Sequence, residues 1–450
     1  MVIFAAMVVP MVWIDLTRPP VPPETDKPAA LGYPSELLDQ EWYHRGVIEV
    51  MAAQWPRVDV VSYDSATTPG YHLVQATALR VTGAWWVVHA LNALMGAALV
   101  TVVFATVFGV TRSGWMSAAL TAPVVGSSYT IGGSIWMTTD NLCWCFVTLA
   151  IGGAALCRFT MGRGARLGVY AMCAVAVRQI HIWPTAVIGL AGLLRSPLAA
   201  LAPGFLRDDA RQAPRAWRYL WVGIAAAAAP AMVLGVFLWL WGGLLPASER
   251  VRILHVDGPN FAAPAFALAT AASVGVFFLP IVWTEVRRLR IADPVLWLAA
   301  SIGIAAGLAV PTSYAPLARG GGWLWQVAGR LPVVMDRSVF IAAAAACGAV
   351  VIALLYRGAK RAGSGVPAAM VMLASLGWLC AQTMSTMAWQ RYFDPMAMIT
   401  VAMVAALGIG RDTPRWAWAG PVALGAFQAA LTIATLHASF IRKVMEASAG

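Results

Sequence analysis

Two acidic residues and a histidine stand together in the first polar stretch of the sequence, Asp39-Gln40-Glu41-Trp42-Tyr43-His44. A carboxylate here could be a general base that removes the proton of an acceptor hydroxyl. On a helix Asp39 and Glu41 would not share a face, because residues i and i+2 diverge, so only a turn or a helix start could aim both into one cleft. The alternative is structural, since acids are favoured at helix N-termini.

Arginines that interrupt or border apolar stretches form a second group of candidates. Arg178, followed by Gln179, lies between two apolar stretches, where its burial is costly unless it is paired or meets an anion. Its planar fork suits phosphate. Arg337 and Arg391 each open a later apolar segment, and three arginines at one membrane level would form a receptor for an anionic lipid head group. The alternatives are a salt bridge from Arg178 to Asp140 and interfacial anchoring of the other two.

Asp140 and the stretch from Tyr63 to Tyr71 are weaker candidates. Asp140 follows Thr139 in strongly apolar surroundings, so it is either a helix cap or a site residue. The stretch 63–71 is polar and contains Asp64 and a Pro-Gly pair, which predicts a turn at the membrane surface and by itself nothing more.

The composition requires lipid as the solvent of most of the chain. Of 450 residues, 60% are hydrophobic and only 11% are charged, too few charges to cover a soluble surface of this size. The net charge of +11 fits the excess of Arg and Lys on the cytoplasmic side of membrane proteins and does not indicate nucleic acid. The six cysteines form no CxxC pair, and no P-loop, GxSxG, HExxH or GxGxxG motif is present.

Roughly thirteen apolar segments predict an all-α integral membrane protein, a single polytopic domain over 1–450. The basic clusters place the N-terminus inside, so the loop 15–80 would be the first extracytoplasmic loop and 82–440 would hold the remaining transmembrane helices. Segments 167–177 and 181–196 are each too short to cross a bilayer, which predicts half-helices that meet at a polar turn facing a cavity. After the segment at Met1–Ile14, the segments are 82–110, 115–135, 138–157, 167–177, 181–196, 219–243, 263–284, 294–313, 337–356, 366–386, 394–410 and 416–439.

Six motifs, in order from residue 41 to residue 393, resemble those of the multi-spanning GT-C glycosyltransferases. Among these the chain is most similar to the dolichyl-phosphate-glucose-dependent alpha-1,2-glucosyltransferase family. The motifs are Glu41-Trp42-Tyr43-His44, Tyr63-Asp64 with Thr67-Thr68-Pro69-Gly70-Tyr71, Thr139-Asp140, Arg178-Gln179 with Ile182-Trp183, Asp336-Arg337, and Arg391-Tyr392-Phe393. The chain departs from the family at its Asp-Glu pair, which aligns with Gln40-Glu41 while Asp39 stands one place earlier, and in the Pro-rich insert Pro19–Pro23.

The resemblance implies a GT-C-type bundle of roughly 11–13 transmembrane or half-membrane helices and an inverting transfer of a hexose, such as glucose, from a polyprenyl-phosphate sugar to a glycan or lipid acceptor. It implies no required cofactor, and a divalent metal, which some relatives use, is not indicated. Asp39 or Glu41 would be the base, and Asp140 would orient the acceptor or the loop. The donor phosphate would be held by Arg178, Gln179, Arg337 and Arg391, and the acceptor or its loop by His44, Asp64, Thr67 and Tyr71.

Two other classes of function remain open on the sequence alone. Buried charges and half-helices also suit a transporter or flippase of a lipid-linked or anionic solute, and the missing Asp-Glu pair also suits a non-catalytic assembly subunit of a cell-envelope complex. The Ala-rich, Arg-over-Lys composition indicates a GC-rich, bacterial source. We therefore expect a plasma-membrane protein whose site faces outside, or one of the endoplasmic reticulum if the source is eukaryotic.

Overall fold

The chain is an all-α polytopic membrane protein, as the sequence predicts. The computed structural model describes residues 1–18, 35–206, 216–249, 251, 258–315, 319 and 322–449, so the Pro-rich insert 19–23 lies outside the described residues. One two-residue hairpin, β1 (Val333–Val334) with β2 (Arg337–Ser338), is the sheet found within these ranges. Six described helices are long and apolar enough to cross a membrane: Trp85–Thr111, Trp217–Trp241, Ala263–Arg287, Val339–Arg361, Gly365–Thr383 and Ala419–Glu446.

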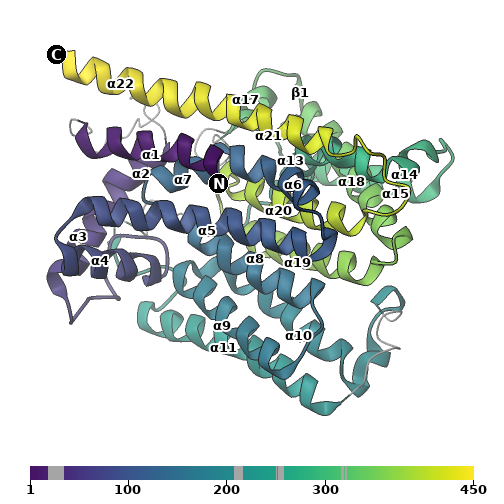
Figure 1. The fold of residues 1–450 in the computed structure, drawn as a ribbon, viewed down its shortest axis with the longest axis horizontal. Helices are drawn as coiled ribbons and strands as arrows, with labels where there is room; N and C mark the ends of the chain where they lie inside the picture. The colour runs from purple at the N-terminus through teal and green to yellow at the C-terminus, as the bar shows by residue number, and fades with distance from the viewer. Residues whose placement is uncertain are drawn as a thin grey trace.

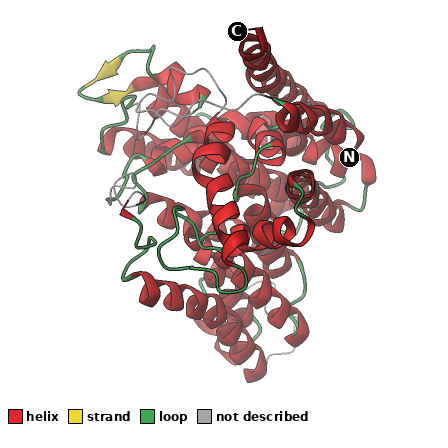
Figure 2. Cartoon of the chain, turned by 90° about the vertical axis from the view of Figure 1, so that its left-hand side faces the viewer, coloured by secondary structure: helices red, strands yellow, loops and turns green. Residues whose placement is uncertain are grey.

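The described part of the predicted loop 15–80 is largely helical. α1 (Val2–Thr17) continues past the predicted end at Ile14, so Asp15 belongs to its last turn. The short elements that follow gather at the left-hand end of the bundle in Figure 1, and loops and short helices cross that end in Figure 2. These elements are α2 (Ser35–Asp39), the π-helix η2 (Gln40–His44), α3 (Arg45–Gln54) and α4 (Gly70–Thr82).

In the middle of the chain, one predicted half-helix is longer than expected. α9 begins at Met161, because the hydroxyl of Thr160 caps its N-terminus, and it therefore has 17 residues where the segment 167–177 was expected. The predicted segment 115–135 is two helices that meet at Ser127. The elements are α5 (Trp85–Thr111), α6 (Gly114–Gly126), α7 (Ser128–Ile135), α8 (Asp140–Leu156), α9 (Met161–Val177), η3 (Gln179–Ile182), α10 (Pro184–Leu194), η4 (Pro197–Leu201), η5 (Gly204–Leu206) and α11 (Trp217–Trp241).

The last third of the chain packs through small residues. Gly348 of α18 lies so close to α13 that an added Cβ would be 1.9 Å from the carbonyl oxygen of Leu268. Such contacts are how helices without a hydrophobic driving force approach one another in lipid. The elements are α13 (Ala263–Gly275), η7 (Val276–Val282), α14 (Trp283–Arg287), α15 (Pro294–Ala309), α17 (Trp323–Ala328), α18 (Val339–Arg361), α19 (Gly365–Thr383), α20 (Gln390–Leu407), α21 (Ala419–Thr432), η8 (Ile433–His437) and α22 (Ala438–Ala449).

One buried amide fixes the turn that precedes Asp140. Asn92 of α5 donates to the carbonyls of Gly133 at 3.0 Å and Trp136 at 2.9 Å, where α7 ends. Its side-chain oxygen accepts from the Tyr71 hydroxyl at 2.9 Å, which ties α4 to the same place. Buried polar groups of this kind destabilise the fold when their partners are removed.

We expect Asn92→Leu to lower the stability of the purified protein by about 2 kcal/mol, because it removes the donor to the buried carbonyls of Gly133 and Trp136 and the acceptor of the Tyr71 hydroxyl. Thermal unfolding in detergent measures the change. The control is Leu94→Ala on the same helix, where the side chain is 64% exposed. Equal melting temperatures for the two variants would contradict the role of Asn92.

Candidate active site

The acidic motif lies on a π-turn that separates its two carboxylates. α2 ends at Asp39, and η2 takes up Gln40 to His44 with one more residue per turn than an α-helix would hold. The Asp39 carboxylate accepts from the guanidinium of Arg391 at the start of α20. Glu41 faces away from that pair and accepts from Arg18 at 2.5 Å. Asp39 and Glu41 therefore do not share a cleft.

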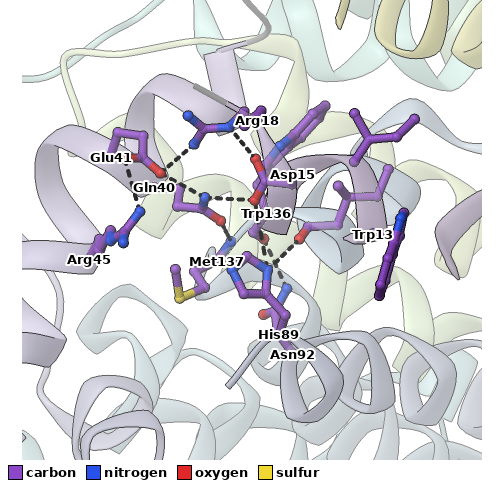
Figure 3. Close-up of polar contacts among 12 residues, drawn as sticks. Trp13, Asp15, Arg18, Gln40, Glu41, Arg45, His89, Asn92, Trp136 and Met137 are labelled. Atoms are coloured by element: carbon purple, nitrogen blue, oxygen red, sulfur yellow. Dashed lines mark hydrogen bonds and ion pairs between the residues drawn. The ribbon is translucent and has the colours of Figure 1, made fainter. Parts of the chain in front are cut away.

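Glu41 and Gln40 belong to a buried cluster that ties η2 to α1, which we call the Asp15–Arg18–Glu41 cluster (Figure 3). Arg18 donates to Asp15 at 2.6 Å as well as to Glu41. The Gln40 amide nitrogen donates to Asp15 at 2.9 Å and to Glu41 at 3.0 Å, and its oxygen accepts from the Met137 backbone at 2.9 Å. Gln40 thus bridges two carboxylates, which a glutamate at this position could not do.

Arg178 lies at the break between α9 and η3, where the chain is extended. Its guanidinium donates to the carboxylate of Asp140, the first residue of α8. The salt bridge considered from the sequence is therefore present. The neighbouring Gln179 is committed to the loop, because its amide donates to the carbonyls of Ala66 at 2.7 Å and Leu244 at 3.1 Å.

The ring of Tyr392 brings Arg178 and Arg391 together. The Cζ atom of Arg178 is 4.8 Å from the ring centroid, and that of Arg391 is 5.0 Å from it. Arg391 also donates to the Tyr392 hydroxyl at 3.0 Å and lies 4.8 Å from the ring of Trp389. Aromatic faces stabilise cations at such distances, so one phenol ring, with Asp39 and Asp140, holds two buried like charges in place. We call Arg178 and Arg391 the arginine pair.

A cavity of about 340 Å³ opens beside the arginine pair. Arg178, Gln179, Thr67 and Tyr392 line it, whereas Asp39, Asp140 and Arg391 are not among the lining residues. The rest of the lining combines apolar and polar side chains, so the cavity suits a ligand with an anionic part and an apolar part. These other residues are Ala66, Trp144, Ile180, His181, Ile182, Leu234, Leu244, Leu245, Trp378, Ala381, Gln382, Met384, Ser385, Thr386 and Met387.

Arg337 stands apart from the arginine pair. It lies on β2, where its guanidinium donates to the carbonyls of Leu308, at 2.7 Å, and Met335. Among the contacts of the described residues, none links it to Arg178 or Arg391. The structure thus brings together two of the three arginines that the sequence grouped.

The remaining candidates of the first loop have hydrogen-bond partners outside the arginine pair. Asp64 accepts from the Ser248 hydroxyl at 2.5 Å, and the Thr67 hydroxyl is 3.2 Å from that of Ser65. His44 stacks on His72, with ring nitrogens 2.9 Å apart. Burial, with the positive charges of Arg391 and Arg178, lowers the pKa of His44 to about 3. The histidine pair is therefore neutral at physiological pH, and its protonation is opposed by the arginine pair.

Sequence reasoning missed two features of the site. It took Asp15 as the start of a loop, although its spacing of three residues from Arg18 at the end of an apolar segment is that of an ion pair on one helical turn. It quoted Tyr392 as part of the Arg391-Tyr392-Phe393 motif but gave no role to this residue, whose ring joins the arginine pair. Among the residues that the structure describes, no group of three or more His, Cys, Asp or Glu could hold a metal ion.

We expect Gln40→Glu to destabilise the protein by about 3 kcal/mol at neutral pH, because it adds an unpaired buried charge beside Asp15 and Glu41. The added carboxyl would be less acidic in the folded than in the unfolded protein, so the loss should shrink as the pH falls and the group becomes protonated. Thermal unfolding against pH measures this. Gln54→Glu, at an exposed position of α3, is the control, and a Gln40→Glu protein as stable as this control at neutral pH would contradict the account of the cluster.

No protein-family model and no curated protein matches the sequence. Two solved structures overlap with most of the chain, both of ArnT from Cupriavidus metallidurans. The apo structure is 13% identical, covers 90% of this chain and 76% of its own, and has a TM-score of 0.31. The structure bound to undecaprenyl phosphate is 14% identical, covers 93% of this chain and 77% of its own, and has a TM-score of 0.33. At scores this low the overlap establishes neither a shared fold nor a shared site.

Proposed function

We propose that this protein is a membrane glycosyltransferase that moves a sugar from a polyprenyl-phosphate donor to the hydroxyl of an acceptor. The observation that carries the proposal is the arginine pair, both members of which contact the ring of Tyr392, beside a cavity with polar and apolar walls. A polyprenyl-phosphate sugar is anionic next to its sugar and apolar along its tail. It matches a site in which buried guanidinium groups border apolar helices.

The arginine pair would bind the phosphate and stabilise it as the leaving group. As the bond between the sugar carbon and the phosphate oxygen breaks, the electron pair and negative charge pass to the phosphate. Guanidinium groups already fixed by an aromatic ring and carboxylates stabilise that charge with little rearrangement. Arg178 lines the cavity and would meet the phosphate first. Arg391 contacts the same Tyr392 ring but does not line the cavity.

We assign the general base to Asp39. Its carboxylate faces the arginine pair through Arg391, whereas Glu41 is committed to Arg18. In the free protein Arg391 neutralises Asp39. A phosphate that draws the Arg391 guanidinium toward itself would release the carboxylate to accept the proton of the acceptor hydroxyl. The acceptor oxygen would then bond to the sugar carbon from the face opposite the phosphate, which gives inversion and predicts that the donor must bind before Asp39 can act.

The finer assignments rest on the motif resemblance. The sugar is a hexose, glucose being the sugar of the family that the chain resembles, and the acceptor is a glycan or lipid on the extracytoplasmic face of a bacterial plasma membrane. Arg and Lys cluster where the helices end away from the site, at Arg158, Arg163 and Arg166 and at Arg357, Lys360 and Arg361. That bias supports an outward-facing site. The base and the phosphate ligands are all side chains of the protein, so the proposed reaction includes no metal step.

We expect Asp39→Asn to lower transfer from a radiolabelled polyprenyl-phosphate sugar by about 10²–10⁴-fold, the usual loss when a general base is removed. Glu41→Gln is the matched change in the cluster. It should keep most of the activity, because Arg18 keeps Asp15 as a partner. It should lower the stability of the protein, because the ion pair between Arg18 and Glu41 is lost. Label incorporated into acceptor by membranes that carry each variant measures both. Full activity of Asp39→Asn would exclude Asp39 as the base, and passage of the lipid-linked sugar across liposomes without transfer would favour a transporter.

We expect Arg178→Gln with Asp140→Asn, which removes the ion pair as a unit, to weaken binding of undecaprenyl phosphate by about 10–100-fold, since a hydrogen bond to a charged group contributes about 1.5–3 kcal/mol. The control is Arg337→Gln, whose side chain contacts backbone carbonyls elsewhere. Titration of the purified protein in nanodiscs gives both dissociation constants. Equal effects of the two changes would contradict a phosphate site at Arg178.

A further inference from the structure

A second cavity, of about 210 Å³, lies between α13, α18, α19 and α20, on the other side of Trp378 from the arginine pair. Trp378 lines both cavities and is itself only 5% exposed. The consecutive residues Tyr392 and Phe393 line the first and the second cavity respectively. The ring of Phe393 packs edge-on against that of Trp378, with centroids 5.1 Å apart. One indole therefore separates a cavity that contains a guanidinium from an apolar one.

The walls of this second cavity are almost entirely apolar. Two of its lining residues carry hydroxyls, Ser375 and Thr400, and these lie 2.9 Å apart and bond to each other. The Ser375 hydroxyl also lies 3.1 Å from the Val371 carbonyl of its own helix. An apolar cavity of roughly 150 Å³ stays dry and accommodates a benzene-sized ligand, so this larger one suits a hydrocarbon occupant.

The second cavity also reaches the outer surface of the bundle. Leu376 of α19 lines it and is 55% exposed on a helix that is apolar enough to span the membrane. A hydrocarbon chain in the bilayer could thus enter at Leu376 and continue inward to Trp378. Trp378 in turn lines the first cavity together with Tyr392 and Arg178.

We infer that this apolar cavity holds the polyprenyl tail of the donor where the tail leaves the phosphate, so that Trp378 separates the head-group site from the tail site. The inference rests on the proposed function and assigns the tail a defined route through the protein instead of a place in bulk lipid. The occupant is the tail of the molecule bound at Arg178 and not the acyl chain of a membrane lipid, because the two cavities share a wall residue and lie on either side of consecutive residues of α20.

The test compares undecaprenyl phosphate with methyl phosphate, which has the same phosphate monoester head group and no tail. The variant Leu376→Trp fills the mouth of the cavity at an exposed position, and Ala271→Phe fills it from α13. Leu298→Trp on α15, at a position that is 61% exposed and does not line the cavity, is the matched control. Dissociation constants are measured in nanodiscs, and thermal unfolding reports whether each variant is folded.

We expect each cavity variant to weaken binding of undecaprenyl phosphate by at least about tenfold, because each buried methylene contributes about 0.8 kcal/mol. Binding of methyl phosphate should not change in the cavity variants, and Leu298→Trp should bind both phosphates like the wild-type protein. Unchanged affinity of both folded cavity variants for the long lipid would overturn the inference, since the cavity would then hold only an ordinary membrane lipid. If the wild-type protein binds neither phosphate, the proposed function is wrong and the inference about the tail is wrong with it.

Discussion

The structure of the site depends on the cost of burying two guanidinium groups at one end of an apolar helix bundle. A buried arginine without a counter-charge is strongly destabilising, whereas a paired one can be tolerated. Arg178 and Arg391 meet this condition through Asp140 and Asp39 and through the shared ring of Tyr392. The pairs connect elements that are far apart in sequence, so satisfying the charges also brings α8, α9, α20 and the first loop to one place.

The same constraint explains why the turn that follows Asp39 is fastened to α1 by ion pairs. Asp39 can reach Arg391 only if η2 holds a fixed position, and the Asp15–Arg18–Glu41 cluster provides that by fastening the π-turn to the end of α1. Gln40 bridges the two carboxylates of this cluster, so the residue that departs from the family motif has a structural role of its own. The two acids of the motif thus serve different purposes, one toward the cavity and one toward the scaffold.

The sequence predicts the general fold and much of the site for simple physical reasons. Apolar segments and sparse charges determine the all-α membrane class, and the cost of an arginine in such a segment identifies Arg178. The divergence of residues i and i+2 correctly predicts that Asp39 and Glu41 point apart. The π-turn and the distance of Arg337 from the arginine pair were not predictable, because each depends on tertiary partners. The capping of α9 by Thr160 is a local contact with the backbone of Arg163, and the sequence analysis overlooked it.

The central claim is that a lipid phosphate replaces Asp39 as the partner of Arg391 and so releases the base. A structure of the protein determined in a nanodisc with undecaprenyl phosphate tests it most directly. We predict that the phosphate contacts Arg178 and Arg391, that Asp39 no longer contacts Arg391, and that the Tyr392 ring still contacts both guanidinium groups. A phosphate bound elsewhere, with the Asp39–Arg391 and Asp140–Arg178 pairs intact, would contradict the account.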